Sequence, residues 1–159
     1  ENFCLENNFA IICISPNSDP GSEKITKYIN KYKDKDWLYS VGSLPRNLFV
    51  NLMTHSKLLI GNSSMGILES PYYKLPVINI GNRQKGRHNA GNVKFVDYKS
   101  KEIIAALKDS IFNKKYLQNI RKIKNPFGNK SSVLKILNVI KSIDLNNQKW
   151  YIKKNTFHE

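Results

Sequence analysis

A pair of serines flanked by glycines has the clearest potential for chemistry in this chain. Gly61, Ser63, Ser64 and Gly66 fall between a run of apolar residues and a stretch with helical spacing. Serine hydroxyls and the unpaired amides of a helix start are donors that suit an anion, and a glycine lets a phosphate approach the backbone closely. The helix dipole adds about 0.3–1 kcal/mol for a negative group there. We predict a phosphate site at this turn, with helix capping by a serine as the alternative.

Glu69 follows about one helical turn later, on the same side of the expected helix as Gly66. A carboxylate does not bind phosphate, but it accepts two hydrogen bonds from a ribose diol, as acidic residues do in nucleotide-binding folds. We therefore predict that Glu69 contacts a ribose, with a solvated helix face as the alternative.

Arginine is rare in this chain, yet two arginines stand close together. Only four of the 26 basic residues are arginine, and Arg83 and Arg87 are two of them. Both follow an expected strand that ends before Gly81. A planar guanidinium binds a diphosphate better than an ammonium group does. We predict that Arg83 contacts the ligand, whereas for Arg87 a surface ion pair is an equal alternative.

Alternating strands and helices are expected to hold these segments. Short apolar runs bounded by turn residues predict strands, and apolar residues at helical spacing predict helices. The alternation predicts an α/β fold with a doubly wound parallel sheet, whose ligands bind at the carboxyl ends of the strands. The expected strands are 9–15, 37–41, 57–61, 76–80 and 93–96, and the expected helices are 22–33, 45–53, 64–73 and 99–143, the last interrupted at 125–129.

The length of 159 residues suits one core, and we predict one domain over residues 1–143 followed by a polar tail over 144–159. No apolar stretch reaches the roughly 18 residues of a membrane span. The start lacks an initiator methionine and the features of a signal peptide. We therefore expect it to be a cut within a longer chain.

The net charge of +14 raises nucleic acid as a partner, but the distribution of charge argues against it. The lysines are spread from Lys24 to Lys154 instead of clustering with aromatic residues and arginine. We expect neither nucleic acid nor a membrane as a partner.

The cysteines and histidines show no pattern of a disulfide framework or a metal site. Cys4 and Cys13 have no partners at metal-ligand spacing, and His55, His88 and His158 are scattered along the chain. We expect a cytoplasmic protein without a metal or a cofactor, with structural or solvated histidines.

Two segments together resemble a known family. Gly61-Asn-Ser-Ser-Met-Gly-Ile-Leu-Glu69 and Pro76-Val-Ile-Asn-Ile-Gly-Asn-Arg-Gln-Lys-Gly-Arg87 are similar to the nucleotide-binding signature of hydrolysing UDP-N-acetylglucosamine 2-epimerases. The similarity extends to residues 15–21, 41–45 and 125–128, whereas the non-hydrolysing epimerases differ at the Ser-Ser and Arg positions. The resemblance implies a glycosyltransferase-B-type fold, in which two Rossmann-like domains face each other, with this chain as the carboxy-terminal half.

The resemblance also implies a role for each matching residue. Ser63 and Ser64 would hold the diphosphate of UDP, Glu69 the ribose hydroxyls, and Arg83 would face the nucleotide. We include Gly66 in this UDP site because of the turn described above. Asn17 and the backbone near Leu44 match positions that line the uracil pocket.

The family reaction removes UDP after proton abstraction at C2 of the sugar and then adds water to the glycal. Its acid and base residues lie in the amino-terminal domain, so the resemblance implies no catalytic residue here and no activity for this chain alone. The implied partners are UDP or a UDP-amino sugar, the amino-terminal domain and further copies in a homo-oligomer. A glycosyltransferase domain and a non-catalytic nucleotide-binding module are the alternatives, and the Asn-Arg-Gln-Lys-Gly-Arg run favours the epimerase.

Overall fold

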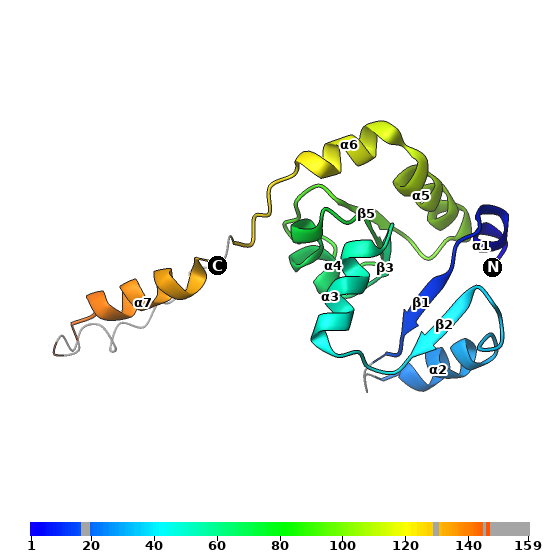
Figure 1. Ribbon diagram of the computed structural model, residues 1–159, viewed down its shortest axis with the longest axis horizontal. Helices are drawn as coiled ribbons and strands as arrows, with labels where there is room; N and C mark the ends of the chain where they lie inside the picture. The colour runs from blue at the N-terminus through cyan, green and yellow to red at the C-terminus, as the bar shows by residue number, and fades with distance from the viewer. Residues whose placement is uncertain (17–19, 129–130, 145, 147–159) are drawn as a thin grey trace. The chain divides into compact units, whose positions relative to one another are not determined.

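The computed structural model describes residues 1–16, 20–128, 131–144 and 146. It contains two compact units that divide between Lys124 and Asn125. The first unit holds all the strands that are described (Figure 1). In the described part of the second unit, α7 covers Ser132–Ser142. A domain over 1–143 with a tail over 144–159 stays a prediction.

Five short strands in the first unit form two parallel sheets. In one sheet, β1 (Ile11–Ile14) pairs with β2 (Leu38–Val41). In the other, β4 (Val77–Ile80) lies between β3 (Leu59–Gly61) and β5 (Val93–Val96). The predicted parallel α/β fold is confirmed, but the described strands do not join into a single sheet. Alternation along the chain predicts parallel strands, but it does not fix which strands form hydrogen bonds with each other.

Helices alternate with these strands as the sequence predicts. The helices of the first unit are α1 (Asn2–Asn7), α2 (Ser22–Asn30), α3 (Arg46–His55), α4 (Met65–Leu68), the 3-10 helix η1 (Ser70–Tyr73), α5 (Ser100–Phe112) and α6 (Lys114–Lys122). None of the described helices is long and apolar enough to cross a membrane.

Two helices are shorter than the sequence pattern indicates, each for a local reason. The helix expected over 64–73 ends at Leu68 and continues as η1, where Pro71 lacks the amide hydrogen that an α-helix needs. The helical stretch after residue 99 breaks at Asn113, whose side chain accepts a hydrogen bond of 3.0 Å from the Tyr116 amide and so caps α6.

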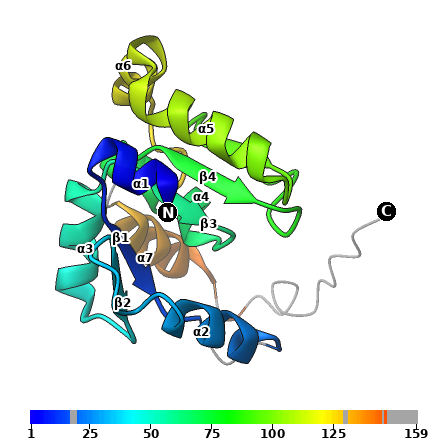
Figure 2. The ribbon, with the colours of Figure 1, turned by 90° about the vertical axis from the view of Figure 1, so that its right-hand side faces the viewer.

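The centre of the core is β4, which is covered on both faces. An added methyl group at Gly66 of α4 would meet Val77, so α4 covers the face to which Val77 points. Ile78 points to the opposite face, as does its neighbour Lys94 in β5, which pairs with Asp109 of α5. Figure 2 shows α4 and α5 on opposite sides of β4. Coverage on both sides explains why Val77 and Ile78, which point to opposite faces, are both buried.

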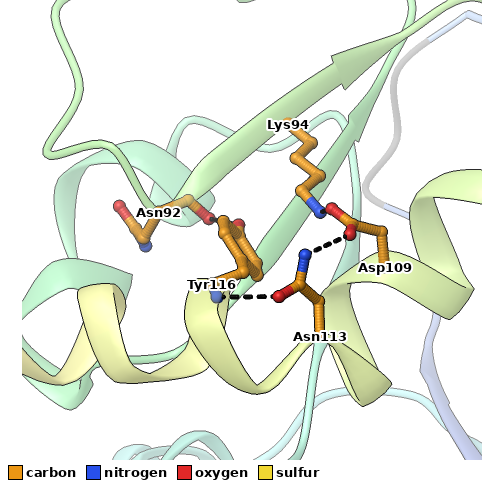
Figure 3. Close-up of polar contacts among 5 residues, drawn as sticks. All are labelled: Asn92, Lys94, Asp109, Asn113 and Tyr116. Atoms are coloured by element: carbon orange, nitrogen blue, oxygen red, sulfur yellow. Dashed lines mark hydrogen bonds and ion pairs between the residues drawn. The ribbon is translucent and has the colours of Figure 1, made fainter.

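A buried hydrogen-bond network lies at the amino ends of β4 and β5. The fully buried Asn92 donates to the Ser70 hydroxyl at 2.7 Å and to the Leu75 carbonyl at 2.8 Å. The Asn92 carbonyl accepts a hydrogen bond of 3.1 Å from the Tyr116 hydroxyl (Figure 3). This network ties β5 to η1 and α6, at the edge of the sheet opposite the predicted site.

Two charged side chains lie near Tyr116 of α6. The Lys94 ammonium lies 3.8 Å from the centre of the Tyr116 ring and pairs with Asp109. Burial, with a smaller contribution from the charge of Asp109, raises the pKa of Tyr116 to about 12. Hydrogen bonds from Lys94 and Asn113 lower the pKa of Asp109 below its ordinary value. The cluster fixes α5 and α6 on the sheet.

Candidate functional site

The predicted ligand residues cluster after the carboxyl ends of β3 and β4. The strand β3 ends at Gly61, one residue before the two serines, and β4 ends at Ile80, directly before the arginine loop. These strands are hydrogen-bonded neighbours in a parallel sheet. Their carboxyl ends therefore meet at one edge, which is where α/β sheets bind ligands.

Most of the helix-start amides at the serine turn are used within the turn. The Ser63 carbonyl accepts from the Gly66 amide at 3.1 Å, and the Ser64 carbonyl accepts from the amides of Ile67 and Leu68 at 2.9 Å each. The Ser63 hydroxyl makes a long contact of 3.4 Å with the Met65 amide. The amides of Gly66, Ile67 and Leu68 are therefore used within the turn. The phosphate site at this turn stays a prediction.

Gly66 has a packing role that the sequence pattern did not indicate. It is buried, and an added Cβ would lie 3.1 Å from a methyl carbon of Val77 and 3.4 Å from one of Leu59. A side chain here would push α4 away from the sheet. The packing of α4 therefore accounts for this glycine, and a contact between Gly66 and a phosphate stays a prediction.

Glu69 forms an ion pair with Arg46, the first residue of α3. The Arg46 Nη2 donates to Glu69 Oε2 at 2.5 Å, and this hydrogen bond raises the pKa of the Arg46 guanidinium above its ordinary value. The two side chains are 65% and 35% exposed, so the pair stays open to solvent and to a ligand. The ion pair is compatible both with a ribose contact and with a solvated helix face, so the ribose contact of Glu69 stays a prediction.

Arg46 also connects Glu69 to the segment of Leu44, which precedes it by two residues. No sequence pattern assigns Arg46 to the site. Its rarity as one of four arginines was the only available signal, because the contact spans 23 residues.

Gln84 links the arginine loop to the serine turn. Its side-chain amide donates to the Asn62 carbonyl at 3.1 Å, and the residue is only 3% exposed. Arg83 beside it is exposed, as Ser63 beside Asn62 is. The contact brings together two segments that the sequence predicts separately. No sequence pattern singles out Gln84.

The two contacts therefore join the segment after Leu44 to Glu69, and the arginine loop to the serine turn. Leu44 is half-buried next to the start of α3, and Asn17 lies outside the described residues. No group of acidic, cysteine or histidine side chains in the described residues is arranged to hold a metal ion.

A pocket of about 290 Å³ borders the arginine loop without containing the predicted ligand residues. It lies at the carboxyl ends of β4 and β5 and is lined by Gly81, Asn82, Lys85, Phe95, Val96, Asp97 and Tyr98.

Comparison with known proteins identifies relatives over most of the chain. Residues 3–141 match the family model described as UDP-N-acetylglucosamine 2-epimerase. A UDP-N,N'-diacetylbacillosamine 2-epimerase (hydrolyzing) of Legionella pneumophila is 32% identical over 91% of this chain and 37% of its own length. A UDP-N-acetylglucosamine 2-epimerase of Neisseria meningitidis is 38% identical over 63% of this chain and 26% of its own length.

Solved structures share the fold. The UDP-GlcNAc 2-epimerase of Neisseria meningitidis, bound to UDP-GlcNAc, matches with a TM-score of 0.66 and 19% identity over 89% of this chain and 39% of its own. The enzyme of Methanocaldococcus jannaschii matches with a TM-score of 0.65 and 21% identity over 88% of this chain and 38% of its own.

This chain thus spans 26–37% of the length of four curated relatives. The match to the family model over nearly the whole described chain, together with the shared α/β fold, confirms the resemblance seen in the sequence. The chain belongs to the UDP-N-acetylglucosamine 2-epimerase family.

Proposed function

We propose that this chain is the UDP-binding half of a hydrolysing epimerase that releases UDP from UDP-N-acetylglucosamine or a related UDP-amino sugar. Relatives from Legionella pneumophila and Campylobacter jejuni are named as hydrolysing 2-epimerases of diacetylbacillosamine nucleotides. A relative from Escherichia coli is named as a polysialic acid biosynthesis protein. A role in making sialic-type sugars, in the cytoplasm and as a homo-oligomer, belongs to the same proposal.

The observation that carries the proposal is the hydrogen bond between Gln84 and the Asn62 carbonyl. It holds the loop of Arg83 against the turn of Ser63 and Ser64. The oxygens of a diphosphate lie close together, so the hydroxyl donors and the guanidinium that bind them must also lie close together. The Gln84–Asn62 contact brings the segments that carry both kinds of donor to one edge.

The charges of the neighbourhood suit an anionic ligand. Arg83, Lys85 and Arg87 are all exposed in the loop after β4. Their positive charges attract a diphosphate and strengthen its hydrogen bonds to the serine hydroxyls. Charge that develops on the departing UDP would be stabilised by the same preorganised donors.

Glu69 supplies the part of the site that distinguishes a nucleotide from a bare diphosphate. Arg46 engages one oxygen of its carboxylate, and each carboxylate oxygen can accept more than one hydrogen bond. A ribose diol can therefore bind while the ion pair persists. Asn17 and Leu44 complete the proposal at the uracil.

The division of labour within the proposal leaves the proton transfers to the amino-terminal domain. A base must lie within about 2.6–3.2 Å of the proton that it removes. Glu69 is assigned to the ribose, which lies across the diphosphate from the sugar. The family match favours the epimerase over a glycosyltransferase domain.

Titration calorimetry of the 159-residue chain with UDP, UMP and ADP tests the proposal. We expect UDP to bind more tightly than UMP, which lacks the second phosphate, and more tightly than ADP, which lacks the uracil. Binding will be weak, since the chain provides one side of the cleft. Equal binding of UDP and ADP, or no binding of either at millimolar concentration, would refute the assignment.

A further inference from the structure

Gln84 is a buried residue in an exposed loop. It is 3% exposed, whereas its neighbours Asn82, Arg83, Lys85 and Gly86 are all exposed. A buried carboxamide is unfavourable unless it forms hydrogen bonds, so its burial indicates a specific contact.

That contact is made by the amide hydrogen of Gln84 alone. Its Nε2 donates to the Asn62 carbonyl at 3.1 Å, while its Oε1 is buried without a partner in the described part of the chain. The side chain is thus held through its donor. A change that removes the donor and keeps the shape would isolate this contact.

The loop around Gln84 is stiffened by its own backbone. The Lys85 amide donates to the Asn82 carbonyl at 2.9 Å, and the Arg87 amide donates to the Gln84 carbonyl at 3.3 Å. These two bonds connect the loop residues on both sides of Gln84. The bond to Asn62 therefore fixes the position of the whole arginine loop relative to the serine turn.

We infer that Gln84 is a positioning residue for the diphosphate, which sets the separation between the serine hydroxyls and the Arg83 guanidinium through its bond to the Asn62 carbonyl. The inference rests on the proposed UDP site. Without this bond, the two loops must be ordered when the ligand binds, and that ordering lowers affinity.

Two variants of similar size separate this role from simple filling of space. Gln84→Glu replaces the side-chain amide donor by a carboxyl oxygen. The ionised carboxylate repels the Asn62 carbonyl, whereas the protonated carboxyl can donate to it. Burial raises the pKa of such a carboxyl, so the donor returns as the pH falls. Gln84→Met fills the same volume without any donor at any pH.

The expected result is a pH dependence that only one variant shows. Relative to the unaltered chain at each pH, Gln84→Met should bind UDP about 3- to 10-fold more weakly, the usual effect of one neutral hydrogen bond. Gln84→Glu should bind at least as weakly near pH 8, where its ionised carboxylate repels the Asn62 carbonyl. The ratio should return towards one as the pH falls and the carboxyl becomes protonated. Gln84→Met should stay weaker at every pH.

Asn92→Asp provides the matched control. Asn92 is also a buried amide, but it lies at the amino ends of the strands. This variant should lose thermal stability without a pH-dependent change in its UDP affinity relative to the unaltered chain. Affinities are compared at temperatures at which thermal melting shows each variant to be folded.

The nitrogen chemical shift of the Ser63 amide reports on the contact without ligand, because it shares a peptide group with the Asn62 carbonyl. In Gln84→Glu this shift should titrate with pH. If the unaltered chain binds no UDP, the proposed function fails, and the role of Gln84 fails with it. If the unaltered chain binds UDP and both Gln84 variants bind as tightly at every pH, the inference alone is overturned.

Discussion

The Arg46 guanidinium and the Glu69 carboxylate lie 2.5 Å apart, which joins the first residue of α3 to the residue that follows α4. The pair spans the two segments that the proposal assigns to uracil and ribose. Its exposure means that it contributes little to stability, since exposed ion pairs are screened by water. The main effect of the ion pair is therefore to orient the Glu69 carboxylate.

Arg46→Ala should weaken UDP binding without lowering the melting temperature. The free Glu69 side chain samples more rotamers, and its ordering opposes binding. Titration calorimetry and scanning calorimetry measure the two effects. Arg46→Lys keeps the charge and should retain more affinity than alanine does. Tighter binding by Arg46→Ala would mean that Arg46 competes with the ribose instead of orienting its acceptor.

Glu69→Gln should weaken UDP binding by about 1.5–3 kcal/mol, the usual value for a hydrogen bond to a charged group. The melting temperature of the free protein should change little, because surface substitutions seldom affect stability. The loss should shrink for 2′-deoxy-UDP, which lacks one hydroxyl of the diol. An equal loss for both nucleotides would contradict the assignment of the ribose to Glu69.

Arg83→Ala should lower the affinity for UDP more than the affinity for UMP, because the guanidinium is assigned to the diphosphate. Arg121→Ala is the matched control, since Arg121 is also exposed but lies on α6. It removes the same charge without touching the arginine loop. If both variants weaken UDP binding equally, only the net charge of the protein matters.

Gly66→Ala should destabilise the protein by about 1 kcal/mol despite the better helix propensity of alanine. The new methyl group would lie 3.1 Å from a carbon of Val77, which is buried and β-branched and so cannot rotate away. Urea unfolding measures the loss. Gly42→Ala meets no atom within 4 Å and should be nearly neutral. A stabilised Gly66→Ala protein would show that α4 shifts freely.

Tyr116→Phe should cost about 0.5–1.5 kcal/mol at neutral pH, because its hydroxyl donates to the Asn92 carbonyl. Burial raises the pKa of Tyr116 to about 12, above the ordinary value. The neutral Tyr116 side chain therefore makes its full contribution to the stability of the folded protein below about pH 10. This contribution is lost as the pH rises towards 12.

Unfolding free energies measured between pH 8 and 12 check this expectation. The unaltered protein should lose more stability than Tyr116→Phe does above about pH 10. Tyr98→Phe, at a tyrosine that is 70% exposed, is the control and should follow the unaltered protein. Parallel curves for the unaltered protein and Tyr116→Phe would contradict a shifted pKa at this residue.

Much of the fold could be predicted because apolar runs end at strong turn residues. The fifth strand was predicted at 93–96 and lies there, and β4 begins directly after Pro76. The helical break at Pro71 also follows from the sequence, because proline lacks the amide hydrogen that a helix interior needs. The division of the strands into two sheets was not readable, because strand pairing is a tertiary property.

The candidate site, like the fold, has parts that the sequence predicts and parts that it does not. The segments of Ser63, Glu69 and Arg83 could be placed at one edge, since parallel strands and their following turns share a direction. Their partners Arg46 and Gln84 could not be identified, because these contacts cross 23 and 22 residues. Such contacts depend on how far each helix is rotated and how each loop folds.

The Gln84–Asn62 bond has a further consequence for how the molecule opens. Loops held by single side-chain hydrogen bonds separate at a lower free energy than paired strands do. We therefore expect the arginine loop to exchange its amide hydrogens with solvent while β3, β4 and β5 stay paired. If the proposed function holds, a sample with native circular dichroism can still fail to bind nucleotide, and hydrogen exchange at residues 82–87 is the better measure of an intact preparation.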